Sequence, residues 1–344
     1  MKRVGLLGLP QSGKSTVFEI LLLGAGAAAP TSQGRESIGV VRVPDSRLDQ
    51  LSRLYQPKKT TYAQIQFVDT IATVAGSARS AAKGQDLFSA VRTCDALALV
   101  LRDFEAGSEP GRDLATLEAE LILNDLALVE GRIERIEKEL RVGKRQNERE
   151  QVLLGRCKTL LESEQPLRAQ SFDADQDRTL RGFQLLTLKP LLVIVNRGDA
   201  ESALAPEAGP GREVVTLRAL LEREVLSLAP GERDGFRAEL GIGEDGLSVV
   251  IRACYRLLGL QSFFTFGEDE CRAWTVRRGA KAVDAAGEIH SDLARGFIRA
   301  EVVPWDKLLE AGSEAKARER AWQRLEGRDY EVQDGDCITV RFNK

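Results

Sequence analysis

The sequence predicts an α/β protein in which a three-layer sheet domain carries an inserted helical hairpin and is followed by a small β-rich α+β domain. Three observations lead to this prediction. Short apolar runs, typical of buried parallel strands, alternate with helical segments over much of the chain. Residues 113–165 instead show the apolar spacing of a coiled-coil seam. After Gln261, aromatic and β-branched residues gather in short runs separated by turns.

The composition is typical of a globular protein and narrows the function classes. Of the 344 residues, 43% are hydrophobic and 29% are charged, and no apolar stretch is long enough to span a membrane. Five scattered cysteines indicate free thiols in a reducing compartment, and the single histidine argues against a histidine-rich metal site. The net charge of −3 gives no overall nucleic-acid footprint. We therefore expect a cytoplasmic protein with neither a signal peptide nor a membrane or DNA partner.

A glycine-rich loop connects the first predicted strand, Val4–Leu7, to the first predicted helix, Thr16–Leu23. The loop sequence GLPQSGKST, residues 8–16, fits the pattern G-x-x-x-x-G-K-[ST]. Its two glycines let backbone N–H groups turn inward, where they and the positive end of the helix form a cradle for phosphate groups. Strand, loop and helix are the context that this motif needs, so we expect a P-loop NTPase domain.

The loop residues have distinct expected roles in binding a nucleotide. Lys14 would place its charge on the β- and γ-phosphates and act in catalysis, and the hydroxyl of Ser15 would bind Mg²⁺. The expected phosphate-binding residues are Gln11, Ser12, Gly13, Lys14, Ser15 and Thr16.

Further strands are predicted along the sheet domain. The segments are β-branched, alternating or continuously apolar, and they are Val40–Val43, Ala63–Val68, Leu97–Leu101, Leu191–Val195 and Val214–Val215. A helix is predicted over residues 171–187. The nucleotide-binding domain is therefore expected to comprise residues 1–112 and 170–260.

A helical arm is predicted over residues 113–169. Its first helix has apolar residues at 4-3-4-3-4 spacing: Ile122, Leu126, Val129, Ile133, Ile136 and Leu140. A turn around Gly143 leads to a second helix, Glu148–Glu164, which predicts an antiparallel coiled-coil hairpin. Residues 132–149 at its far end include seven Lys or Arg and four Glu. This end is either ordinary solvated surface or a basic tip that contacts RNA phosphates, and the sequence leaves both readings open.

Residues 261–344 predict the small β-rich domain. Its predicted strands contain Phe263–Phe266, Trp274–Val276, Phe297–Val303 and Cys337–Phe342. Together with the loop and the arm, this domain resembles the YchF/Obg-like ATPase family. The stretches most similar to the family's TGS-type, ubiquitin-like domain are Phe263–Glu268, Arg272–Gly279, Ile289–Asp292, Gly296–Val302, Trp322–Tyr330 and Val332–Asp336.

The resemblance implies a Mg²⁺-dependent nucleoside triphosphatase that binds GTP or ATP, hydrolyses it slowly and associates with ribosomes or RNA as a regulatory switch. It also implies that Asp69 holds Mg²⁺ through a water molecule. Three positions depart from the pattern of these nucleoside triphosphatases. Ala72 replaces a glycine of the second switch, Gln33 stands where the first switch has a threonine, and Thr73 replaces the catalytic glutamine of ordinary GTPases. These departures leave an alternative function: a nucleotide-sensing adaptor with little or no hydrolysis.

The segment Asn196-Arg197-Gly198-Asp199 follows a predicted strand, where a guanine-reading Asn-Lys-x-Asp would lie. A carboxylate at Asp199 would accept hydrogen bonds from the N1–H and 2-amino groups of guanine, whereas the family usually has Glu there and tends to favour ATP. The expected base-binding residues are thus Asn196, Arg197 and Asp199, with a capped strand-to-helix turn as the alternative interpretation. The choice between GTP and ATP stays open.

Overall fold

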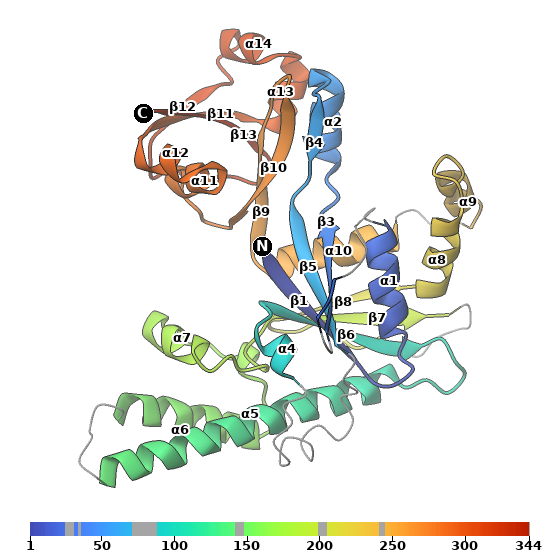
Figure 1. Cartoon of the computed structure of the whole chain (residues 1–344), viewed down its shortest axis with the longest axis vertical. Coiled ribbons are helices and arrows are strands. Elements are labelled where there is room, and N and C mark those ends of the chain that lie inside the picture. Colours follow the sequence, from blue (N-terminus) through green and yellow to red (C-terminus); the bar gives the residue numbers. More distant parts are fainter. Residues whose placement is uncertain are drawn as a thin grey trace. The chain divides into compact units, whose positions relative to one another are not determined.

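The computed structural model describes residues 1–24, 31–33, 36–70, 88–141, 148–198, 205–240 and 245–343 (Figure 1). The chain divides into two compact units. Unit 1 consists of Met1–Val41 and Gln66–Leu257, and unit 2 consists of Arg42–Ile65 and Leu258–Lys344. The sequence prediction had assigned residues 42–65 to the nucleotide-binding domain, and this assignment is wrong because they pack with the C-terminal residues.

Unit 1 is built on a seven-stranded sheet with the order β2-β3-β5-β1-β6-β7-β8. The strands are β1 (Lys2–Gly8), β2 (Thr31–Gln33), β3 (Glu36–Arg42), β5 (Gln64–Thr70), β6 (Ala96–Asp103), β7 (Leu191–Arg197) and β8 (Arg212–Leu217). Strands β1, β6, β7 and β8 are parallel, and β2 is antiparallel to β3. The carboxyl ends of the parallel strands therefore meet at one edge of the sheet, which is where ligands bind in such folds.

Helices cover both faces of this sheet (Figure 1). On one face, α1 (Lys14–Gly24), α8 (Ala219–Ser227) and α10 (Gly246–Leu257) pack on one another. The opposite face is covered by α4 (Ser89–Arg92) and α5 (Pro110–Arg141). Alternate leucines of β6 and alternate apolar residues of β7 pack there against Leu114, Leu117 and Leu121 of α5 in one buried core. The predicted three-layer α/β architecture is confirmed.

Unit 2 contains a six-stranded sheet with the order β12-β11-β13-β9-β10-β4. Its strands are β4 (Lys59–Thr61), β9 (Leu260–Thr265), β10 (Glu270–Arg277), β11 (Phe297–Pro304), β12 (Arg324–Glu326) and β13 (Asp336–Phe342). Its helices are α2 (Ser46–Tyr55), α11 (Ala282–Ile289), α12 (Ser291–Arg295), α13 (Trp305–Ala311) and α14 (Glu314–Glu319). The four β-rich runs predicted from the sequence thus correspond to β9, β10, β11 and β13.

Residues from the first fifth of the chain complete unit 2. Strand β4 adds to the sheet edge in parallel with β10. Arg47 of α2 forms ion pairs with both Asp45 and Asp334 at 2.8 and 2.9 Å. The pair between Arg47 and Asp334 joins residues 287 positions apart, so no local sequence pattern could predict it.

The arm is an antiparallel pair formed by the long helix α5 and α6 (Glu148–Glu162). Its core contains the predicted seam residues Ile122, Val129 and Ile136, packed with apolar residues of α6. Pro110 opens α5, a position that suits a residue without a backbone N–H. None of the helices within the described ranges is long and apolar enough to cross a membrane.

The chain returns from the arm through a 3₁₀ turn, η2 (Leu167–Ala169), and a short helix, α7 (Ala174–Arg181). The helix predicted over residues 171–187 is therefore too long. Asp173 and Gln176 form a capping box that starts α7. The helix stops at Gly182, and Gln184 has a positive φ of 52°, which a continuing helix does not allow.

A buried polar network fixes the base of the arm to the sheet domain. The side chain of Asp125, on α5, is fully buried and accepts hydrogen bonds from the backbone N–H groups of Leu186 and Thr187 at 3.0 and 2.7 Å. It also accepts from the hydroxyl of Thr187 at 2.8 Å and faces Arg92 of α4 at 3.4 Å. Arg92 donates in addition to Asn124. Burial raises the pKa of Asp125, and these donors oppose that shift.

Replacing Asp125 should therefore destabilise the protein strongly. We expect Asp125→Ala to lower the free energy of unfolding by about 3–5 kcal/mol, because it leaves two buried N–H groups without their acceptor and removes the carboxylate that faces the buried guanidinium of Arg92. Urea titration followed by circular dichroism measures this. Glu137→Ala, an exposed carboxylate on the same helix, is the matched control and should change stability by less than about 0.5 kcal/mol. Equal effects of the two substitutions would contradict the importance of the network.

Candidate nucleotide-binding site

The phosphate loop has a strained backbone that only certain residues allow. It spans the end of β1 at Gly8 and the start of α1 at Lys14. Gly13 has a φ of 85°, in the left-handed region that favours glycine, and Gln11 has a φ of 64°. A Cβ at Gly13 would also lie 2.3 Å from Nδ2 of Asn196. Glycine is therefore required at position 13 for two reasons: the backbone has a positive φ there, and the side chain of Asn196 leaves no space for a Cβ atom.

The loop encloses a cavity of about 380 Å³. Asp69, at the carboxyl end of β5, lines this cavity opposite the loop and accepts a hydrogen bond from Nζ of Lys14. The other lining residues belong to the loop and to the first turn of α1: Gly8, Leu9, Pro10, Gln11, Ser12, Gly13, Lys14, Ser15 and Thr16. Every residue predicted to bind phosphate or Mg²⁺ thus lies around one cavity.

The oxygen atoms at this cavity suit a small divalent cation. Ser15 offers a hydroxyl and Asp69 a carboxylate, and hard oxygen ligands are those that Mg²⁺ prefers. Mg²⁺ in such sites takes few protein ligands and shares the phosphate oxygens of its nucleotide. Ser15 and Asp69 therefore fit Mg²⁺ bound together with a nucleotide.

Asn196 braces the loop from the end of β7. Its side chain is 4% exposed. Nδ2 donates to the backbone oxygen of Ser12 at 3.2 Å, and Oδ1 accepts from the backbone N–H of Ala219 at 3.1 Å. One amide thus joins the phosphate loop to the first residue of α8. Base contact by Asn196 stays a prediction.

The other predicted base-binding residues are placed differently. Arg197 ends β7, and its Nε donates to Oδ2 of Asp103 at 3.1 Å. Asp199 lies outside the described residues, as do the switch positions Ala72 and Thr73. For Gln33 the structure describes the backbone of β2 alone.

Asp103, the carboxylate partner of Arg197, was not predicted from the sequence. The available signal was its position, because an acidic residue directly after a buried apolar run lies at the carboxyl edge of a parallel sheet. That edge also carries the phosphate loop.

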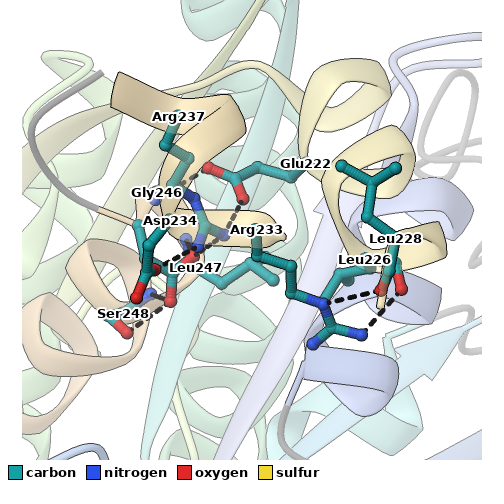
Figure 2. Close-up of polar contacts among 10 residues, drawn as sticks. Glu222, Leu226, Leu228, Arg233, Asp234, Arg237, Gly246, Leu247 and Ser248 are labelled. Carbon is teal, nitrogen blue, oxygen red and sulfur yellow. Dashed lines mark hydrogen bonds and ion pairs between the residues drawn. The ribbon is translucent and has the colours of Figure 1, made fainter. Parts of the chain in front are cut away.

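A polar cluster fixes α8, the helix that Asn196 contacts (Figure 2). Glu222 of α8 accepts from the N–H of Gly246 at 2.8 Å and from Arg237, on α9 (Arg233–Glu239), at 3.1 Å. Arg237 also donates to Asp245, which caps the first turn of α10. Burial raises the pKa of Glu222, while Gly246 and Arg237 favour its charged form. The cluster holds three helices together, and the first residue of one of them, Ala219 of α8, donates its N–H to Asn196.

These features define the P-loop nucleoside-triphosphatase class. A strand, a glycine loop and a helix meet at the carboxyl edge of a parallel sheet, and a lysine and an aspartate that line the cavity are hydrogen-bonded to each other.

Comparison with known proteins identifies the family within this class. The family YchF-GTPase_C, described as "Protein of unknown function (DUF933)", matches residues 260–343. The chain is 39% identical to the "Ribosome-binding ATPase YchF" of Bacillus subtilis, over 98% of each chain. It is 36% identical to the protein of the same name from Escherichia coli O157:H7, over 99% of each. The solved structure of the Schizosaccharomyces pombe YchF GTPase aligns with a TM-score of 0.82 and 26% identity, over 99% of this chain and 97% of that one. The chain belongs to the YchF family.

The brace formed by Asn196 can be tested by its effect on stability. Asn196→Ala should lower the free energy of unfolding by about 1–3 kcal/mol, because it leaves a buried carbonyl and a buried N–H without partners. Gln165→Ala, which removes an exposed amide, should have little effect. Chemical denaturation of both variants measures the difference, and an Asn196→Ala protein as stable as the control would contradict the brace.

Proposed function

We propose that this protein is a Mg²⁺-dependent nucleoside triphosphatase that binds GTP or ATP, hydrolyses it slowly and acts as a ribosome- or RNA-associated regulatory switch in the cytoplasm. The observation that carries the proposal is the cavity in which Lys14 and Asp69 face each other beneath the glycine loop. The family relatives support it, since the bacterial ones are named ribosome-binding ATPases and the fission-yeast one is named a GTPase. Membrane and DNA partners are not expected.

The chain's own residues account for binding of a triphosphate. Backbone N–H groups of the loop and the N-terminus of α1 bind phosphate oxygens. The ammonium group of Lys14 stabilises negative charge on the β- and γ-oxygens as it develops. Ser15 and Asp69 hold Mg²⁺, which neutralises charge on the same oxygens when bound.

The residues that line the cavity support slow hydrolysis. Among the described residues that line the cavity, Asp69 is the one carboxylate, and it already accepts a hydrogen bond from Lys14. A group that orients or deprotonates the attacking water contributes about 10²–10⁴-fold to rate. Turnover without such a group, or with one supplied by the ribosome, fits a switch better than a metabolic enzyme.

Hydrolysis should depend on Lys14. We expect Lys14→Ala to reduce phosphate release from ATP and GTP by about a hundredfold or more, because it removes a charge aimed at the reacting phosphates. Lys58→Ala is the matched control, since Lys58 also pairs with an aspartate, Asp269, but both side chains are at least 80% exposed. Phosphate release in the presence of Mg²⁺ is the measurement. Equal activity of the two variants would overturn the assignment, and a parent that binds nucleotide without turnover would support the adaptor function.

Ribosome association should depend on salt and on the arm. We propose that the basic end of the arm contacts phosphates of ribosomal RNA. Reversing the charge of Arg141, Lys144 and Arg145 should then reduce co-sedimentation with ribosomes. Raising the salt concentration should weaken ribosome binding by the parent steeply: the logarithm of the binding constant should fall with the logarithm of the salt concentration, with a slope of about 0.7–0.9 per phosphate contact. Equal pelleting of parent and variant across the salt series would show that the arm tip is solvated surface.

A further inference from the structure

A buried ion pair ties the carboxyl ends of β6 and β7 together. Asp103 and Arg197 end these two strands and are direct partners in the parallel ladder. Nε of Arg197 donates to Oδ2 of Asp103 at 3.1 Å. The side chain of Asp103 is 3% exposed and that of Arg197 is 32% exposed. The carboxylate is therefore fixed inside unit 1, while part of the guanidinium side chain reaches the edge of the sheet.

The neighbours of this pair leave its backbone little room to move. Gly198 donates its N–H to the backbone oxygen of Asp103 at 3.1 Å, and a Cβ on Gly198 would lie 3.0 Å from Cα of Phe104. The ring of Phe104 approaches the phosphate loop, with Cε1 3.8 Å from the position of a Cβ on Gly13. The ion pair thus lies beside Phe104, whose ring approaches the phosphate loop, and its arginine belongs to the segment predicted to read the base.

We infer that Asp103 is a positioning residue for the purine base: it holds the guanidinium of Arg197 in one orientation so that its plane can stack on the bound base. This inference rests on the proposed nucleotide binding and specifies which residues recognise the base. A planar guanidinium stacks favourably on an aromatic ring, and its preorganisation by a carboxylate lowers the entropy lost on binding. Without Asp103, the partly exposed Arg197 side chain would be free to turn toward water.

The ion pair should affect binding of the base and not binding of the phosphates. A purine nucleotide should gain affinity from the pair, whereas a polyphosphate that has no base should not. Titration calorimetry with Mg²⁺ can therefore compare ADP, GDP and inorganic tripolyphosphate as probes. The proteins needed are the parent, Asp103→Ala, Arg197→Met and the double variant, which together form a double-mutant cycle.

Asp103→Ala should lower the affinities for ADP and GDP about five- to tenfold and change the affinity for tripolyphosphate less than twofold. The weakening should disappear when Asp103→Ala is made in the Arg197→Met protein, because the carboxylate acts through the guanidinium. Glu213→Ala is the matched control. It breaks a pair with Arg256 at 3.3 Å near the amino end of β8, at the edge of the sheet remote from the loop, and should change no affinity.

Two results would overturn the inference. One is that Asp103→Ala reduces the affinities for the nucleotides and for tripolyphosphate equally. The other is that Asp103→Ala still reduces nucleotide affinity in the Arg197→Met background. Thermal unfolding of each variant shows that the compared proteins are folded at the temperature of titration. Failure of the proposed function looks different, because the parent would then bind all three probes no better than Lys14→Ala does.

Discussion

The hydrogen bond from Asn196 to the backbone oxygen of Ser12 joins the end of β7 to the phosphate loop, and the geometry of the site depends on it. The loop must hold Gln11 at a positive φ, which is unfavourable for a residue other than glycine. The parallel sheet brings β1 and β7 to either side of β6, so that one amide can hold the loop and the start of α8 at once. Preorganised backbone donors are what make such a loop an effective phosphate site, since no reorganisation is needed when the ligand binds.

Charged groups inside unit 1 are paired wherever the chain must keep two elements in a fixed position. Asp125 joins the arm to the sheet domain, Glu222 joins α8 to α9 and to the start of α10, and Asp103 joins the ends of β6 and β7. Burial of each carboxylate costs free energy, so these pairs specify geometry more than they add stability. They differ in what they fix: the first holds the arm, the second holds helices together, and the third holds the ends of two strands.

Sequence patterns predicted the elements that depend on local periodicity. The runs around Leu97 and Leu191 are strands, the seam from Ile122 to Ile136 packs as a hairpin, and the glycine loop forms a cavity. Features that depend on distant partners escaped prediction. Strand β4 is three residues long and is defined by its pairing with β10.

Side-chain partners escaped prediction for a similar reason. Arg197 was assigned to the base from its place in a motif, but its carboxylate partner, Asp103, lies 94 positions earlier in the chain. The helix predicted after the arm was too long because apolar spacing continues past the point where the backbone changes direction.

Titration calorimetry of nucleotide-stripped protein tests the central claim, that the braced loop is a working nucleotide site. The titrants are ADP, GDP and non-hydrolysable analogues of ATP and GTP, each with and without Mg²⁺. The account predicts saturable one-to-one binding of at least one purine nucleotide, with a Mg²⁺-dependent difference between its diphosphate and triphosphate forms. Absence of binding, or equally weak binding of all four with no effect of Mg²⁺, would contradict it.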